Sequence, residues 1–90
     1  MDRVKGKIMS KDAFLQNIPY AKEPYEGILV SADTQNNQYK IAVQLSENQV
    51  LVVDQVRDSE VKERLLEWIP RVNDIQIQYG VNNDPENYSN

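Results

Sequence analysis

Carboxylate side chains are the most chemically competent groups in this chain, and several of them recur on one segment. Glu60, Glu63 and Glu67 are spaced three and four residues apart, and Asp54 and Asp58 precede them. Paired carboxylates act as general acid and base when their surroundings separate their pKa values. We expect these glutamates on the solvent side of a helix, where no such separation arises. Their predicted role is therefore binding, as an acidic surface that meets a basic partner or as a merely solvated helix face.

The chain contains no histidine and no cysteine. It therefore lacks the commonest general base, the commonest zinc ligands, and any thiolate nucleophile or disulfide. The five serines have no histidine to activate them, and the sequence shows no serine–lysine motif. The acidic stretches DQVRDSE and NDPEN do not have the spacing of an EF-hand calcium loop. We predict a protein without enzymatic activity, without a metal and without a cofactor.

The net charge of −4 is distributed unevenly along the chain. Four bases lie within the first eleven residues: Arg3, Lys5, Lys7 and Lys11. From residue 23 onward the balance is −7, and an acidic body argues against broad nucleic-acid binding because phosphates require a clustered positive surface. The alternative function is a nucleic-acid-associated small barrel, in which this basic arm acts together with Tyr20 and Tyr25.

Aromatic side chains supply the remaining candidate contacts with a partner. Trp68 flanks the apolar side of a predicted helix, where it is either a core anchor, which we favour, or a partly exposed interface residue. The dipeptide Pro-Tyr occurs twice, and Tyr20 and Tyr25 either cover one edge of the core or form a recognition arm. Tyrosine usually packs its ring and exposes only its hydroxyl, which favours the first interpretation.

Three strands rich in apolar residues form the centre of the predicted fold. They cover residues 27–33, 38–45 and 50–53, and Asn36-Asn37 is a turn pair between the first two. The third strand is apolar on both faces, which is typical of a central strand that is covered on both sides. We expect an outward sheet face rich in amides, open to a partner: Lys40, Ala42, Gln44, Gln76 and Gln78.

Helix signals lie on both sides of the strands. A helix over residues 59–69, with Asp58 or Ser59 as its cap and Pro70 at its end, is the clearest of them. Its apolar arc is broad and includes Lys62 at its edge: Val61, Leu65, Leu66, Trp68 and Ile69. A short helix is predicted to begin after Ser10 and to end before Pro19. The alternation in NDIQIQYG predicts a closing strand at 74–79.

These elements predict a single α+β domain over residues 1–81: a small antiparallel sheet made of a three-strand meander and a closing strand, with helix 59–69 and a short N-terminal helix. Residues 1–9 are open to interpretation as a flexible basic arm, and 82–90 as a disordered acidic tail. The alternative architecture is a small OB- or SH3-like barrel, for which residues 3–9 would have to supply a fifth strand.

Size, composition and charge together indicate a small, non-enzymatic protein-binding module. It would act by stoichiometric contact through the acidic helix face or a sheet surface, as an inhibitor, immunity-type protein, adaptor or accessory subunit. The expected partner is another protein, with a basic surface, and nucleic acid is the less favoured partner. The first residues do not have the apolar core of a signal peptide, and no run is long enough to span a membrane, so we expect a cytoplasmic location.

Overall fold

The structure is a computed structural model, and it describes residues 5–16, 18–19 and 27–79. One antiparallel sheet holds five strands in the order β1-β5-β4-β3-β2. The strands are β1 Lys7–Ser10, β2 Ile18–Pro19, β3 Ile28–Asp33, β4 Gln38–Gln44 and β5 Gln49–Val56. The helices are α1 Lys11–Phe14, α2 Val61–Trp68 and α3 Val72–Gln78, with 3-10 turns at Asp58–Glu60 and Ile69–Arg71. The predicted α+β class is confirmed.

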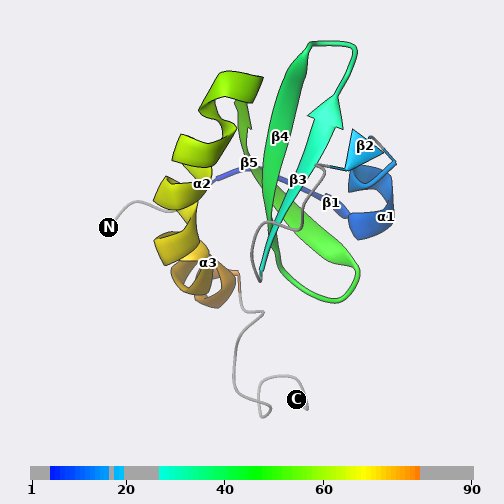
Figure 1. Ribbon diagram of the computed structural model, residues 1–90. Coiled ribbons are helices and arrows are strands. Elements are labelled where there is room, and N and C mark those ends of the chain that lie inside the picture. The colour runs from blue at the N-terminus through cyan, green and yellow to red at the C-terminus, as the bar shows by residue number, and fades with distance from the viewer. Residues whose placement is uncertain (1–4, 17, 20–26, 80–90) are drawn as a thin grey trace.

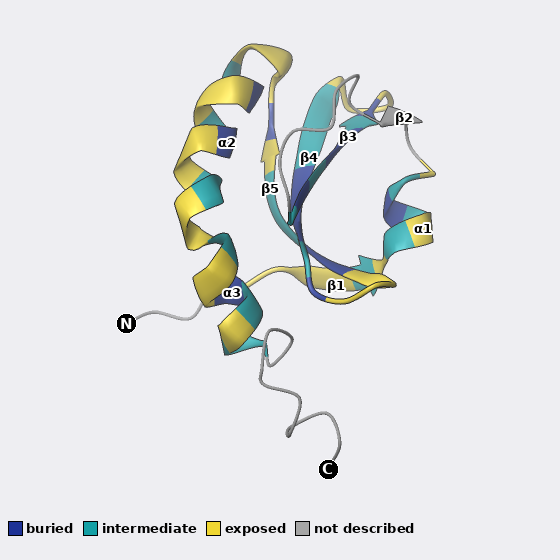
Figure 2. Ribbon diagram, turned by 60° about the horizontal axis from the view of Figure 1, so that its bottom comes forward, coloured by how far each residue is buried: buried dark blue, intermediate teal, exposed yellow. Residues whose placement is uncertain are grey.

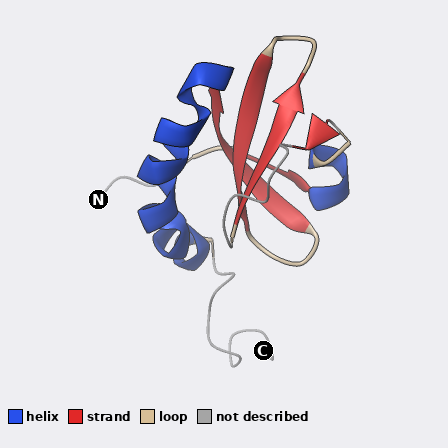
Figure 3. Ribbon diagram, in the orientation of Figure 1, coloured by secondary structure: helices blue, strands red, loops and turns tan. Residues whose placement is uncertain are grey.

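The helices lie on both sides of the sheet. Figure 1 shows α2 and α3 following one another along one face, while α1 lies on the opposite side of the strands. The same arrangement is visible in Figure 3, where the strands separate the long helical segment from the short helix. The sheet is therefore the middle layer of the molecule, and the outer side of α2 and α3 is part of its surface.

The predicted meander of β3, β4 and β5 is confirmed, and so is its first turn. Asn37 has a positive φ of 57°, a backbone region that asparagine tolerates better than most residues. The carboxylate of Asp33 accepts hydrogen bonds from the backbone N–H and the side-chain amide of Asn36, at 3.3 and 2.8 Å. Local side-chain bonding thus fixes this hairpin end.

Strand β5 is covered on both faces, as its doubly apolar sequence predicts. Val50 packs with Phe14 of α1 and with Ala42, and all three are buried. On the opposite face Leu51 packs with Val43, Leu45 and Ile75 of α3, which are buried as well. The burial of Ala42 contradicts the predicted outward amide face, because α1 covers this part of the sheet. Figure 2 shows buried residues on the strands and exposed residues along the outer side of α2 and α3.

The predicted closing strand at 74–79 is wrong, because the segment forms α3. Val72, Ile75 and Tyr79 have helical spacing, and Ile75, at 1% exposure, is the residue that enters the core. The side-chain amide of Gln76 donates to the carbonyl of Gln44 at 2.8 Å, which joins α3 to β4. A short run with two isoleucines fits both periods, so contact with the sheet decides the conformation. Pro70 does not end the helical segment, since it lies in the first turn of a new one.

The N-terminal region differs from the prediction in two ways. Ser10 caps α1 by accepting a hydrogen bond from the N–H of Ala13 at 3.0 Å, as expected, but the helix ends at Phe14. Ile18 is extended in β2, consistent with the restriction that Pro19 places on the residue before it. Residues 7–9, interpreted above as part of a flexible arm, belong to β1. They supply the strand that the barrel alternative required, but β1 and β2 stand at opposite ends of the strand order, so the sheet is open.

Gly6 sets how closely the chain before β1 approaches β5. A Cβ atom at this position would lie 2.1 Å from the carbonyl oxygen of Val52, which is backbone and cannot move aside alone. We predict that Gly6→Ala lowers the free energy of unfolding by about 1–3 kcal/mol, the usual cost of overpacking. Urea denaturation followed by Trp68 fluorescence measures it. The exposed neighbour is the control, and equal midpoints for Gly6→Ala and Lys5→Ala would contradict the prediction.

Candidate functional site: the outer face of α2 and α3

A β-bulge in β5 determines which side chains lie beneath α2. Ile41 pairs with Asp54 and Ala42 pairs with Val52, so Val53 is an extra residue on β5. Paired residues of an antiparallel ladder share a face of the sheet. Asp54 therefore lies on the face of Ile41, under the helix. Strict alternation after Val52 would instead have placed it on the face of Ala42.

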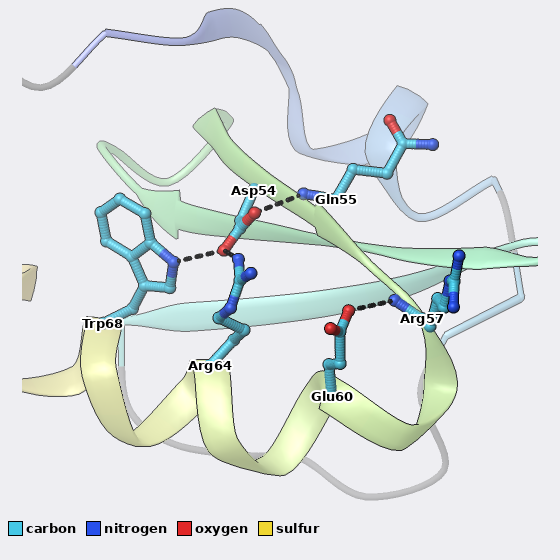
Figure 4. A network of polar contacts seen from close by, with 6 residues as sticks. All are labelled: Asp54, Gln55, Arg57, Glu60, Arg64 and Trp68. Atoms are coloured by element: carbon cyan, nitrogen blue, oxygen red, sulfur yellow. Dashed lines mark hydrogen bonds and ion pairs between the residues drawn. The ribbon is translucent and has the colours of Figure 1, made fainter.

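Asp54 is the centre of a polar network beneath α2 (Figure 4). One carboxylate oxygen accepts hydrogen bonds from the guanidinium Nη1 of Arg64 at 2.8 Å and from the indole Nε1 of Trp68 at 2.9 Å. The other accepts from the backbone N–H of Gln55 at 2.8 Å. Arg71 stacks over the ring of Trp68, 4.9 Å from its centroid. Arg64 and Trp68 are one turn apart, so a single carboxylate contacts two consecutive turns of the helix.

Opposing influences act on the pKa of Asp54. Partial burial raises the pKa, whereas the hydrogen bonds from Trp68, Arg64 and Gln55 lower it. Together the hydrogen bonds outweigh burial, so the pKa lies below its ordinary value. The same contact acts on the partner: Asp54 is the main cause of the raised pKa of Arg64, with Glu60 and Glu67 contributing less. At neutral pH the pair is therefore fully ionised, as a charge-assisted contact requires.

Two of the predicted binding residues thus hold the fold together. The side chain of Asp54 is only 16% exposed and points at α2, away from solvent. Trp68 packs against both apolar clusters beneath the helices, as the core-anchor interpretation requires. The sequence shows both residues, but it does not show their contact, because the bulge that brings them together has no signature in the continuous apolar run of residues 50–53.

Two of the three glutamates lie exposed on α2, as predicted, and the third belongs to the 3-10 turn before it. Glu63 and Glu67 are exposed, while Glu60 is half-buried and accepts a 3.3 Å hydrogen bond from the backbone N–H of Arg57. This bond caps the first turn in place of the Asp58 or Ser59 side chain that the sequence suggested. Asp74 on α3 is exposed too. Sequence reasoning missed it, because the strand predicted at 74–79 would have placed Asp74 on a different element from the helical glutamates.

Leu66 does not belong to the buried side of α2. It was expected in the apolar arc, but it is 59% exposed, and on α3 the side chain of Ile77 is 52% exposed. Lys62, expected at the edge of the same arc, is exposed as well. The sheet covers Val61 and Leu65, and Leu66 lies beyond the border of the covered strip. The sequence did not predict an outer face with two large, exposed apolar side chains.

Asp58 is separate from this face. It lines a hollow of about 500 Å³ at the end of the β3–β4 hairpin, together with other polar residues: Asn36, Asn37, Gln38, Arg57 and Ser59. The hollow is lined by one acid, one base, amides and a hydroxyl, and this mixture of side chains does not select a particular ligand over water. Lys5, Lys7 and Lys11 lie on or beside β1. Tyr20, Tyr25 and Arg3 fall outside the described residues, so the tyrosine arm stays a prediction.

Within the described part of the chain, neither Ser31 nor the acidic residues form a catalytic or metal-binding arrangement. Ser31 is opposite Lys40 in the β3–β4 ladder, but it is fully buried, and its hydroxyl has no hydrogen-bond partner within the described part of the chain. An activated serine needs a base within hydrogen-bond reach and access to substrate. No group of acidic residues that could hold a metal ion occurs in residues 5–16, 18–19 and 27–79. In the same ranges no helix is long and apolar enough to cross a membrane.

Comparison of the chain with protein-family models, with curated proteins and with solved structures found no match. The geometry of the outer face of α2 and α3 is therefore the basis of the proposed function.

The network beneath α2 predicts a specific pH dependence. An asparagine at position 54 carries no charge, so it cannot offer Arg64 and Trp68 a charged acceptor. We therefore expect Asp54→Asn to lower the free energy of unfolding by about 1–3 kcal/mol at pH 7. Because the folded pKa of Asp54 is lowered, this contribution is complete above the unfolded value of about 3.9 and is lost as the pH falls through and below it. Urea unfolding of both proteins between about pH 7 and pH 2 measures the difference.

The comparison isolates Asp54 from other acids. Asp33, whose pKa the side chain of Asn36 lowers, titrates in the same range but is present in both proteins. A stability difference that stays constant down to pH 2 would show that Asp54 acts by its shape and not by its charge.

Proposed function

We propose that this protein is a small protein-binding module that acts by stoichiometric contact, without catalysis. Its contact surface is the outer face of α2 and α3, and its partner is a protein with a basic surface. One observation carries the proposal: Arg64, one of the two bases of α2, is directed at Asp54, while Glu63 and Glu67 stand exposed on the outer side. The other base, Lys62, is exposed as well.

The electrostatics of α2 favour a basic partner. Glu63 and Glu67 are four residues apart on the helix, and like charges at this spacing destabilise it by a few tenths of a kcal/mol. A lysine or arginine from another protein, placed between them, replaces this repulsion by two attractive contacts. Charges of this kind act on the association rate and on specificity more than on affinity itself.

The geometry favours a surface that is ready to bind. Trp68 and Arg64 are tied to Asp54, Gln76 is tied to Gln44, and Arg71 stacks on Trp68. The bonds to Asp54 and to Gln44 hold the helical segment to the sheet at two places along its length. Little conformational entropy would then be lost from the helical backbone on binding, which is the advantage of a pre-organised interface.

We predict that Glu63→Gln/Glu67→Gln loses partner proteins that the unchanged chain retains. The tagged full-length proteins are used to capture partners from a nuclease-treated lysate of the cells that make them, at two salt concentrations. The stability of the variant should change by less than about 0.5 kcal/mol, because both positions are exposed. The expected result is one protein retained in near-stoichiometric amount and lost with the variant.

The matched control is Asp12→Asn/Glu47→Gln, which changes the net charge equally at two exposed sites away from α2 and α3. Retention by this control separates a local contact from a general charge effect. Recovery of the same proteins by all three chains would contradict the proposed surface. Partners that disappear only after nuclease treatment would support the basic arm and nucleic acid instead.

A further inference from the structure

The outer face of α2 and α3 carries an apolar line beside an acidic line. The apolar line consists of Leu66, Pro70 and Ile77, all exposed. The acidic line consists of Glu63, Glu67 and Asp74, also exposed. In each line the first two residues are four positions apart and the third follows seven positions later, so the three side chains lie on one side of the helical segment. The interval between Glu67 and Asp74 includes the exposed base Arg71, which stacks on Trp68. Neither line is visible in the sequence while residues 74–79 are taken for a strand.

The two helices share one outer face although Pro70 lies between them. The residues that face the sheet keep helical spacing from one helix to the next: Val61, Leu65, Val72, Ile75 and Tyr79. Figure 1 shows α3 continuing the course of α2 along the sheet. At about 100° per residue, the apolar line lies on the side of the helices opposite the residues that face the sheet. The acidic line lies directly beside the apolar line. Leu66 and Ile77 are separated by eleven positions, or ~16 Å along a helix.

From this arrangement we propose that the outer face of α2 and α3 docks a basic amphipathic helix of another protein. Two apolar side chains of that helix, about three turns apart, pack against Leu66 and Ile77. A line of lysines or arginines beside them meets Glu63, Glu67 and Asp74. This inference rests on the proposed function and specifies the partner that it left open.

The chemistry of the face selects this occupant over two others. A second copy of the chain, packed antiparallel, would bring its acidic line against the same line of the first copy, which like-charge repulsion opposes. An extended peptide would find no free backbone groups along these helices, whereas strand addition requires a sheet edge. A helix satisfies its own backbone hydrogen bonds and offers apolar and basic lines at matching intervals.

The test uses the full chain and a library of alanine-based helical peptides, about 18 residues long, with randomised apolar and charged positions. Peptides selected for binding are expected to be basic, with two apolar residues about three turns apart. Fluorescence anisotropy then gives the affinity of a selected peptide for four proteins: the unchanged chain, Leu66→Ala/Ile77→Ala, Glu63→Gln/Glu67→Gln, and Ile8→Ala. Ile8, at 48% exposure on β1, is the matched apolar control.

We expect Leu66→Ala/Ile77→Ala to weaken binding at least about tenfold, as for interface anchor residues, while Ile8→Ala stays within about twofold. The glutamine variant should bind more weakly and with less dependence on salt. All three variants replace exposed side chains, and their urea midpoints verify folding.

The alternative outcomes separate this inference from the proposed function. If binding depends on Glu63 and Glu67 but not on Leu66 and Ile77, the amphipathic-helix inference fails and the acidic binding face stands. If no basic peptide is enriched, or if binding is indifferent to both double variants, both proposals fail.

Discussion

The contact between the carboxylate of Asp54 and α2 is the constraint on which the rest of the structure depends. A carboxylate that is largely withdrawn from water destabilises a fold unless hydrogen bonds and an opposite charge compensate it. Asp54 has both, from Arg64, Trp68 and the backbone of Gln55. Since Arg64 and Trp68 lie one turn apart, their common acceptor fixes the rotation of α2 about its axis as well as its position along the sheet.

The bulge at Val53 makes this contact possible. Before the bulge, Leu51 faces α3 and Val52 faces α1, and after it both Asp54 and Val56 lie under α2. Without the extra residue, Val52 and Asp54 would face the same side of the sheet by strict alternation. Asp54 would then lie on the side of Phe14. One inserted residue thus converts a position that would cost stability in an apolar layer into the anchor of a helix.

Local patterns were sufficient for much of the fold. The meander follows from alternating side chains and from Asn36-Asn37, and α2 follows from the spacing of its apolar residues. The errors occur where two elements have to meet: α3, whose isoleucines fit either period until Ile75 enters the core, and β1, whose four residues become a strand only by pairing with β5. The acidic residues of α2 were predicted, whereas Asp74 and the exposed apolar residues depend on tertiary contacts.

The exposed apolar line is a consequence of the same contact. Trp68 and Leu66 form the two borders of the apolar arc of α2, about 160° apart on a helix, and the sheet covers only part of that arc. Rotation of α2 in one direction would bury Leu66 and expose the indole. Asp54 selects the border with the indole N–H, because leucine has no donor to offer the carboxylate. Leu66 is then left outside, beside Glu63. The interaction that stabilises the fold therefore also sets the composition of the surface through which we propose that the protein binds.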